Sequence, residues 1–297
     1  MNLVENFQNY LRDFKVEDKY IPQLKSDMDA LSKSNGAMKS LSNEIEAYKS
    51  FDFDFSRTVS AAEIAANEVG VHPYSARLIY LTSLANFALP YFERVGLGKE
   101  EWYDSMCDFR WNAELCYTKT GVYGNNSEWS KRFMTAERIA FGRLQYNCLE
   151  AGIEYKSENF DLKPDTFVIT VHIPSDTRSP FSPENRMASY ARASKFYKNR
   201  FADGRVIFRC GTWLLSPLHR EILPEGSNIR SFLDEYELVP SSYHEGFDDL
   251  GRIFGVWSYN GDAETLPEDN SLRRAYKKHI MGGGKIGHMT GFRYGNI

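Results

Sequence analysis

Apolar residues recur at spacings of three and four along the chain up to about Gly121, with almost no alternation of apolar and polar positions. This period is typical of amphipathic helices, which carry their apolar side chains on one face. Residues 60–69, 75–95 and 100–118 predict three such helices, and Gly70 is suited to end the first of them in the left-handed conformation. The first fifty residues are more polar, and we expect them to wrap loosely on these helices.

After a cluster of Gly, Asn and Ser at residues 121–131, the pattern changes. Four segments rich in β-branched and apolar residues predict strands, at 138–149, 166–173, 205–215 and 252–258. The segment 166–173 is almost continuously apolar, which is typical of a strand in the middle of a sheet that is covered on both faces.

A helix is expected between the second and third of these strands. Ser182 can cap its first turn, Pro183 suits the first helical position, and the apolar pattern continues to about Phe201. A strand, a helix and a strand in this order form a βαβ unit, so the two strands should be parallel neighbours joined by a right-handed crossover.

The chain is therefore expected to have two domains, with an α+β or mixed α/β organisation. An all-helical domain over residues 1–135 precedes a mixed β-sheet flanked by helices over residues 136–297. The length of 297 residues and the 42% apolar content suffice for a sizeable core. Because 36 Lys and Arg face 40 Asp and Glu, for a net charge of −4, the overall charge gives no support for a nucleic-acid partner.

No apolar run approaches the roughly 18 residues of a membrane span, and the first ten residues lack the apolar centre of a signal peptide. We expect a cytoplasmic protein that does not contact a membrane. The four cysteines include no CxxC pair, which favours reduced thiols. The six histidines lack a spacing such as HExxH, so no metal site is predicted.

His172 is the first candidate for chemistry, since it stands at the carboxyl end of the strand 166–173. Ligands of open α/β sheets bind at this end of the strands, and an imidazole can accept a proton near neutral pH. A histidine satisfied by the following turn is the alternative. Tyr146 could protonate a leaving thiolate, although its place on a strand favours a structural phenol.

Three residues of the next strand and its exit are further candidates. Cys210 could be a nucleophile, but its apolar neighbours favour an inert core thiol. Trp213 fits the core or the wall of a pocket, and Ser216 is placed to form a hydrogen bond with a ligand. The loop 174–181 and the helix start at Ser182 form a candidate anion site, because free amides and the helix dipole favour phosphate there.

Four segments carry a resemblance to a known family: HIP at 172–174, CGTWLLSP at 210–217, LPEGSNI at 223–229 and LPEDNSLRRA at 266–275. They resemble an uncharacterised acyltransferase family that pairs a helical N-terminal domain with a C-terminal domain similar to the GNAT N-acyltransferase fold. The resemblance covers essentially the whole chain and is clearest over residues 138–297. It implies transfer of an acyl group from acyl coenzyme A (acyl-CoA) to an amine, and we expect that group to be acetyl.

The resemblance also implies where the co-substrate, acetyl-CoA or another acyl-CoA, would bind. The central strand would be 166–173, with main-chain amides that polarise the thioester, and the pyrophosphate loop would be 174–183. The expected co-substrate contacts are Val171, Ile173, Ser175, Arg178, Ser179 and Ser182. From the residues themselves we infer His172 as the base and Tyr146 as the acid, with Trp213 and Ser216 at a small-molecule or peptide amine acceptor.

Two other functions remain open. The loop 174–178 reads PSDTR and lacks the spaced glycines of the usual GNAT phosphate loop. This favours a binding or regulatory module that keeps the GNAT-like sheet and holds a small polar ligand such as a sugar or peptide. A hydrolase would require an acidic partner for His172.

Overall fold

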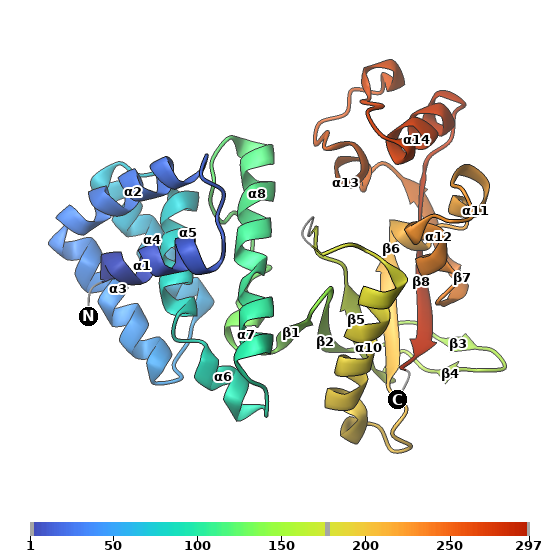
Figure 1. Cartoon of the computed structure of the whole chain (residues 1–297), viewed down its shortest axis with the longest axis horizontal. Helices are drawn as coiled ribbons and strands as arrows, with labels where there is room; N and C mark the ends of the chain where they lie inside the picture. Colours follow the sequence, from blue (N-terminus) through green and yellow to red (C-terminus); the bar gives the residue numbers. More distant parts are fainter. Residues whose placement is uncertain (1–2, 176–178, 296–297) are drawn as a thin grey trace. The chain divides into compact units, whose positions relative to one another are not determined.

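The computed structural model describes residues 3–175 and 179–295. The chain forms two compact units, which adjoin in the sequence at Ala140 and Phe141; Pro174 and Ser175 group with the first unit. The sequence pattern places the boundary between residues 135 and 136. Figure 1 follows the chain through both units, from the N-terminal helices to the C-terminal strand.

The first unit is helical. Its helices among the described residues are α1 (Leu3–Asp13), α2 (Ile21–Lys33), α3 (Asn35–Lys49), α4 (Phe55–Val69), α5 (Pro73–Ala85), α6 (Leu89–Arg94), α7 (Lys99–Met106), α8 (Asp108–Thr120) and α9 (Lys131–Met134). Helix α5 forms the centre, because nearly all of its residues are buried and α1, α2, α3, α4 and α8 pack against it. As predicted, α4 ends at Gly70, which is left-handed with a φ of 73°.

The first fifty residues are an integral part of this unit, so the expectation of loose wrapping was wrong. Phe7, Tyr10, Leu24, Leu41 and Tyr48 are each at most 1% exposed. These helices are amphipathic: their average composition is polar, but each has an apolar face that packs into the core.

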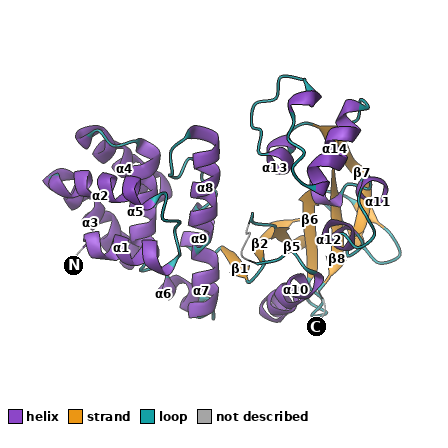
Figure 2. Cartoon of the chain, turned by 45° about the horizontal axis from the view of Figure 1, so that its top comes forward, coloured by secondary structure: helices purple, strands orange, loops and turns teal. Residues whose placement is uncertain are grey.

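A six-stranded mixed sheet dominates the rest of the chain (Figure 2). Its strands lie in the order β1 (Arg138–Phe141), β2 (Leu144–Glu150), β5 (Phe167–His172), β6 (Ile207–Thr212), β8 (Ile286–Tyr294) and β7 (Glu237–Gly246). Strands β5 and β6 are parallel, whereas β2–β5, β6–β8 and β8–β7 are antiparallel. The separate hairpin pairs β3 (Tyr155–Lys156) with β4 (Asp161–Leu162). The mixed sheet after a helical region confirms the predicted fold class.

Helix α10 (Pro183–Tyr197) connects the two parallel strands, as predicted. The Ser182 hydroxyl caps it by accepting a hydrogen bond from the Asn185 amide. Its Tyr190 ring contacts Tyr146 and Phe208, so α10 covers one face of the sheet. The other helices of this unit among the described residues are α11 (His219–Ile222), α12 (Asn228–Leu233), α13 (Leu250–Phe254) and α14 (Ser271–Met281).

Two predicted strands are shorter than expected. The segment 138–149 is two strands, because Gly142 adopts a φ of 70° in the turn between β1 and β2. The segment 205–215 leaves the sheet at Thr212. The Thr212 side chain accepts a hydrogen bond from the Leu214 amide and starts a short 3₁₀ turn. Local side-chain capping therefore overrides the strand propensity at this end.

The predicted strand 252–258 was wrong, since its first residues belong to the helix α13, which ends at Gly255 with a φ of 74°. A short apolar run does not by itself distinguish a helix from a strand. Strands β7 and β8 were not predicted. Strand β7 contains Pro240 and a bulge, both tolerated because β7 is the last strand in the sheet order.

A glycine of β8 allows close packing on the sheet and gives a first prediction. A Cβ atom at Gly291 would lie 2.9 Å from the Tyr236 Cβ and 3.2 Å from the Glu237 carbonyl oxygen. Gly291→Ala should therefore lower the free energy of unfolding by about 1–3 kcal/mol in urea titrations. Gly211 on β6 is the matched control, since its added Cβ would have no contact closer than 3.4 Å. Gly211→Ala should leave stability unchanged or raise it slightly, and equal losses in both variants would contradict the packing argument.

Candidate active site

Strand β5 lies between β2 and β6 in the sheet (Figure 1). It is paired with both, but not over the same length. Its register with β2 runs over all six residues of Phe167–His172. Its register with β6 has only two pairs, Ile169 with Phe208 and Thr170 with Arg209. Beyond this point β6 continues in register with β8 alone. The carboxyl end of β5 is thus held from one side, in the third position of the sheet.

His172 is the last residue of β5 and is half-buried. Its Nε2 atom lies 2.6 Å from the Oδ1 atom of Asn147 on β2. The Asn147 amide nitrogen donates to the carbonyl oxygen of Cys148 at 3.0 Å, so the amide oxygen faces the imidazole and accepts from it. In the neutral imidazole, Nε2 then carries the hydrogen and Nδ1 carries the lone pair.

The same face of the sheet carries further polar side chains. The register pairs Asn147 with Thr170 and Thr170 with Arg209, and Thr170 lies two residues before His172. These four side chains therefore share one face, because strand residues alternate between faces. Burial lowers the pKa of the Arg209 guanidinium.

Two histidines and a carboxylate that were not among the predicted site residues lie farther along the sheet. The rings of His244 and His288 stack with centroids 4.7 Å apart across β7 and β8. Burial lowers the pKa of His288, while the Asp249 carboxylate opposes that shift; burial in turn raises the pKa of Asp249. Only the pairing of β7 with β8 brings these residues together, and neither strand was predicted.

Tyr146 is not beside His172. It pairs in register with Val171, so its side chain lies on the opposite face of the sheet, beneath α10. The phenol is fully buried, bonds to the Ser189 hydroxyl at 2.9 Å, and burial raises its pKa. It is therefore separated from the base that it was expected to serve.

The start of α10 offers fewer donors than the sequence suggested. Pro183 has no N–H group, and the Asn185 amide is bonded to Ser182. Ser175 is exposed and Ser179 is half-buried. Arg178 lies outside the described residues.

Two guanidinium groups stand at this loop. Arg143, from the turn between β1 and β2, and Arg186 of α10 lie 5.0 and 4.7 Å from the centroid of the Phe181 ring. Arg186 also donates to the Phe181 carbonyl oxygen at 2.6 Å and pairs with the half-buried Glu235. Arg186 thereby holds Phe181 just before the start of α10. The sequence carried no signal for Arg143, because its turn was read as the middle of a strand.

Trp213 and Ser216, the predicted acceptor contacts, are both buried. Trp213 is 8% exposed and lies edge-on to the rings of His219 and Tyr276. Ser216 is fully buried, and its hydroxyl has no partner among the described residues. Burial raises the pKa of the Cys210 thiol to about 12, in keeping with an inert core cysteine.

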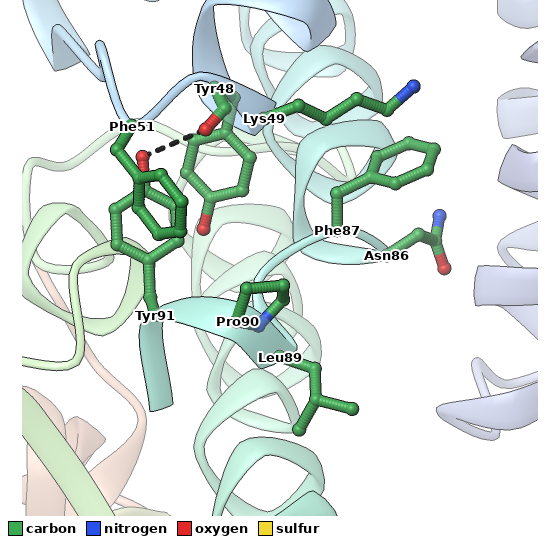
Figure 3. Close-up of a pocket in the computed structure, with 8 residues that line it drawn as sticks. All are labelled: Tyr48, Lys49, Phe51, Asn86, Phe87, Leu89, Pro90 and Tyr91. Carbon is green, nitrogen blue, oxygen red and sulfur yellow. Dashed lines mark hydrogen bonds between the residues drawn. The ribbon is translucent and has the colours of Figure 1, made fainter. Parts of the chain in front are cut away.

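The helical unit contains a pocket of about 320 Å³ (Figure 3). Its walls include the rings of Phe51, Phe87 and Tyr91, and the Tyr91 hydroxyl donates to the Tyr48 carbonyl oxygen at 3.0 Å. Another pocket, of about 300 Å³, lies between the starts of α12 and α14. Neither is lined by His172 or Asn147.

No helix among the described residues is both long and apolar enough to cross a membrane. Within residues 3–175 and 179–295, no group of His, Cys, Asp and Glu side chains is arranged to hold a metal ion.

A helical region followed by a mixed sheet with two partly paired parallel strands and a capped connecting helix is a GNAT-like arrangement. The sequence model for the GNAT-like C-terminal domain matches residues 139–293. Because this match covers more than half of the chain, the chain belongs to that family. No curated protein matches the sequence.

Solved structures share this fold. An acyltransferase in complex with decanoyl-CoA and teicoplanin is 19% identical, with a TM-score of 0.67 over 97% of this chain and 87% of that one. A mutant acyltransferase in complex with octanoyl-CoA is 19% identical, with a TM-score of 0.68 over 98% and 88%. An acyltransferase in complex with decanoyl-CoA is 17% identical, with a TM-score of 0.62 over 97% and 98%. The chain therefore has the fold of these acyltransferases.

The buried His219 predicts a pH dependence of stability. Its ring nitrogens lie 3.2 Å from the Leu214 carbonyl oxygen and 2.6 Å from the Tyr276 hydroxyl, and burial lowers its pKa from 6.5 to about 4. Below about pH 6.5 the unfolded chain binds a proton that the folded chain does not. The free energy of unfolding should therefore fall as the pH drops from 6.5 towards 4, by roughly 3 kcal/mol from this group.

Urea titrations at several pH values across that window measure this dependence. His219→Gln should flatten it, whereas the matched variant His279→Gln, at a half-buried histidine elsewhere in the same unit, should retain the full slope. An unchanged slope in His219→Gln would show that His219 is not the group responsible.

Proposed function

We propose that the protein is an acyl-CoA-dependent N-acyltransferase. The observation that carries the proposal is the end of the β5–β6 register at Thr170 and Arg209, two residues before His172. Val171 and Ile173 lie beyond this point, and their main-chain amides are the groups that we assign to the thioester carbonyl. The fold shared with acyltransferases that bind decanoyl-CoA and octanoyl-CoA supports the same site for the donor here.

The donor's pyrophosphate would lie at the loop before α10. Ser179 offers a hydroxyl there, and Arg143 contributes positive charge beside Phe181. Ser175, Arg178 and Ser182 remain proposed contacts. We assign the loop and Arg143, more than the helix start, to the phosphates, because Pro183 and the Ser182 cap leave few free amides in the first turn.

In the proposed reaction, the neutral amine of the acceptor attacks the thioester carbonyl carbon. The C–N bond forms, the C–S bond breaks, and coenzyme A leaves as the thiol once its sulfur has taken up a proton. His172 accepts the proton that the amine loses, through Nδ1, because Asn147 orients the ring by accepting from Nε2. The amides of Val171 and Ile173 stabilise the oxyanion, worth a few kcal/mol per donor. Tyr146 takes no part in this mechanism.

The acyl group of the donor is the second part of the proposal. Acetyl was the expectation from the sequence, whereas related structures contain octanoyl-CoA and decanoyl-CoA. We propose a medium-length acyl chain on this ground. The acceptor is a small-molecule or peptide amine, and the presence of teicoplanin in one related complex makes a glycopeptide the first candidate to assay.

Thermal unfolding with a series of donors tests the binding step. Decanoyl-CoA and acetyl-CoA share the same coenzyme A part, so the difference between their effects on the melting temperature reports the acyl chain. A ligand at a hundredfold excess over its dissociation constant stabilises the folded state by about 2.7 kcal/mol. We expect both to raise the melting temperature, and decanoyl-CoA to raise it more. No shift with either donor would contradict the proposal and favour the binding or regulatory module.

Steady-state kinetics test the base. His172→Ala should lower kcat/KM by about 10²–10⁴-fold, because general-base catalysis is lost, while the dissociation constant of decanoyl-CoA stays the same. Release of coenzyme A thiol, measured with a panel of amines that includes glycopeptides, gives the rates. His279→Ala is the matched control and should retain full activity. Full activity in His172→Ala would remove His172 from the mechanism.

A further inference from the structure

We propose that Thr170 and Arg209 form a carboxylate-binding subsite beside His172. The two residues face each other across β5 and β6 at the last paired position before the strands part. Thr170 is only 6% exposed, and its hydroxyl oxygen has no hydrogen-bond partner among the described residues. The Nε atom of Arg209 is likewise buried, with no hydrogen-bond partner in residues 3–175 and 179–295. Two adjacent donors on one face thus lack an acceptor.

The other face of the same sheet shows how this protein ordinarily treats a buried arginine. Arg293 on β8 is 9% exposed and forms an ion pair with Glu235 at 3.2 Å, while Arg186 pairs with the same carboxylate. Within the described part of the chain, no carboxylate forms such a pair with Arg209. Arg209 as a whole is half-buried, and its Nε is a buried donor without an acceptor. Such a donor destabilises a folded chain. An anion supplied from outside would remove that penalty.

The geometry favours a carboxylate. A guanidinium edge and an adjacent hydroxyl present donors side by side, which matches the two oxygens of a planar carboxylate. The nearby imidazole of His288 adds no fixed positive charge, since burial lowers its pKa. A phosphate dianion would therefore be poorly neutralised in this place.

The distance along the strand limits which substrate carries the carboxylate. Thr170 precedes His172 by two residues on the same face, a separation of about 7 Å at the strand rise. This inference rests on the proposed function. At that distance, the subsite suits either an amine acceptor with a carboxylate a few bonds from its nitrogen, or an acyl group that ends in a carboxylate. Both sources have the same recognition chemistry.

Thermal unfolding in simple salts tests the subsite without any acyl-CoA. Sodium acetate should raise the melting temperature of the wild type above that in sodium chloride or sodium phosphate of equal ionic strength. Arg209→Met should abolish the acetate effect. Arg205→Met should retain it, because that exposed arginine pairs with Asp203. Equal acetate effects in the wild type and Arg209→Met, or a larger effect of phosphate, would overturn the proposal.

The same variants separate binding from a structural role. Because Arg209 and Thr170 have no partner to lose, Arg209→Met and Thr170→Val should not lower the melting temperature in chloride. Arg293→Met should lower it, since Glu235 loses one of its two arginines. A loss in Arg209→Met as large as that in Arg293→Met would overturn the proposal by showing that Arg209 supports the fold.

Two acyl-CoA molecules whose acyl chains have the same length identify which substrate carries the carboxylate. Tighter binding of succinyl-CoA than of butyryl-CoA, lost in Arg209→Met, assigns the subsite to the acyl group, and equal binding assigns it to the acceptor. The effect of acetate on the melting temperature requires no acyl-CoA. If acetate has no effect, the subsite is overturned and the proposed function is not. Failure of every acyl-CoA to bind contradicts the proposed function alone.

Discussion

The candidate site depends on the different pairing of β5 with its two neighbours. Strand β2 holds β5 along its whole length, whereas β6 is in register with it at only two positions. A strand held on one side keeps its side chains fixed while its other edge is open to a ligand. The pairing with β2 places Asn147 where it orients His172, and the register with β6 ends two residues before that histidine.

The two faces of the sheet are chemically different. Beneath α10, charges and phenols satisfy one another: Arg186 and Arg293 share Glu235, and Tyr146 bonds to Ser189. The face that carries His172 retains donors without partners. A layer in which these charges and phenols are paired thus supports a layer with unused hydrogen-bonding capacity, which is the arrangement expected where a substrate supplies the missing partners.

The sequence was sufficient for the fold where local signals agreed with the tertiary structure. The cap at Ser182, the apolar strand and the left-handed Gly70 each depend on nearby residues, and each lies where it was predicted. Strand β8 was missed because its glycines serve packing with segments that are distant in the sequence. The site was only partly predictable for the same reason: the faces of Tyr146 and Arg209 follow from strand register, which composition does not specify.

Hydrogen exchange on the intact protein tests the central claim most directly. A decanoyl-CoA analogue with a thioether in place of the thioester would be added, and amide exchange of residues 171–173 would be compared with that of the free protein. The account predicts slower exchange at these amides and in the loop before α10, with little change at Tyr48 and Tyr91 in the pocket of the helical unit. Protection confined to that pocket, with residues 171–173 unchanged, would contradict it.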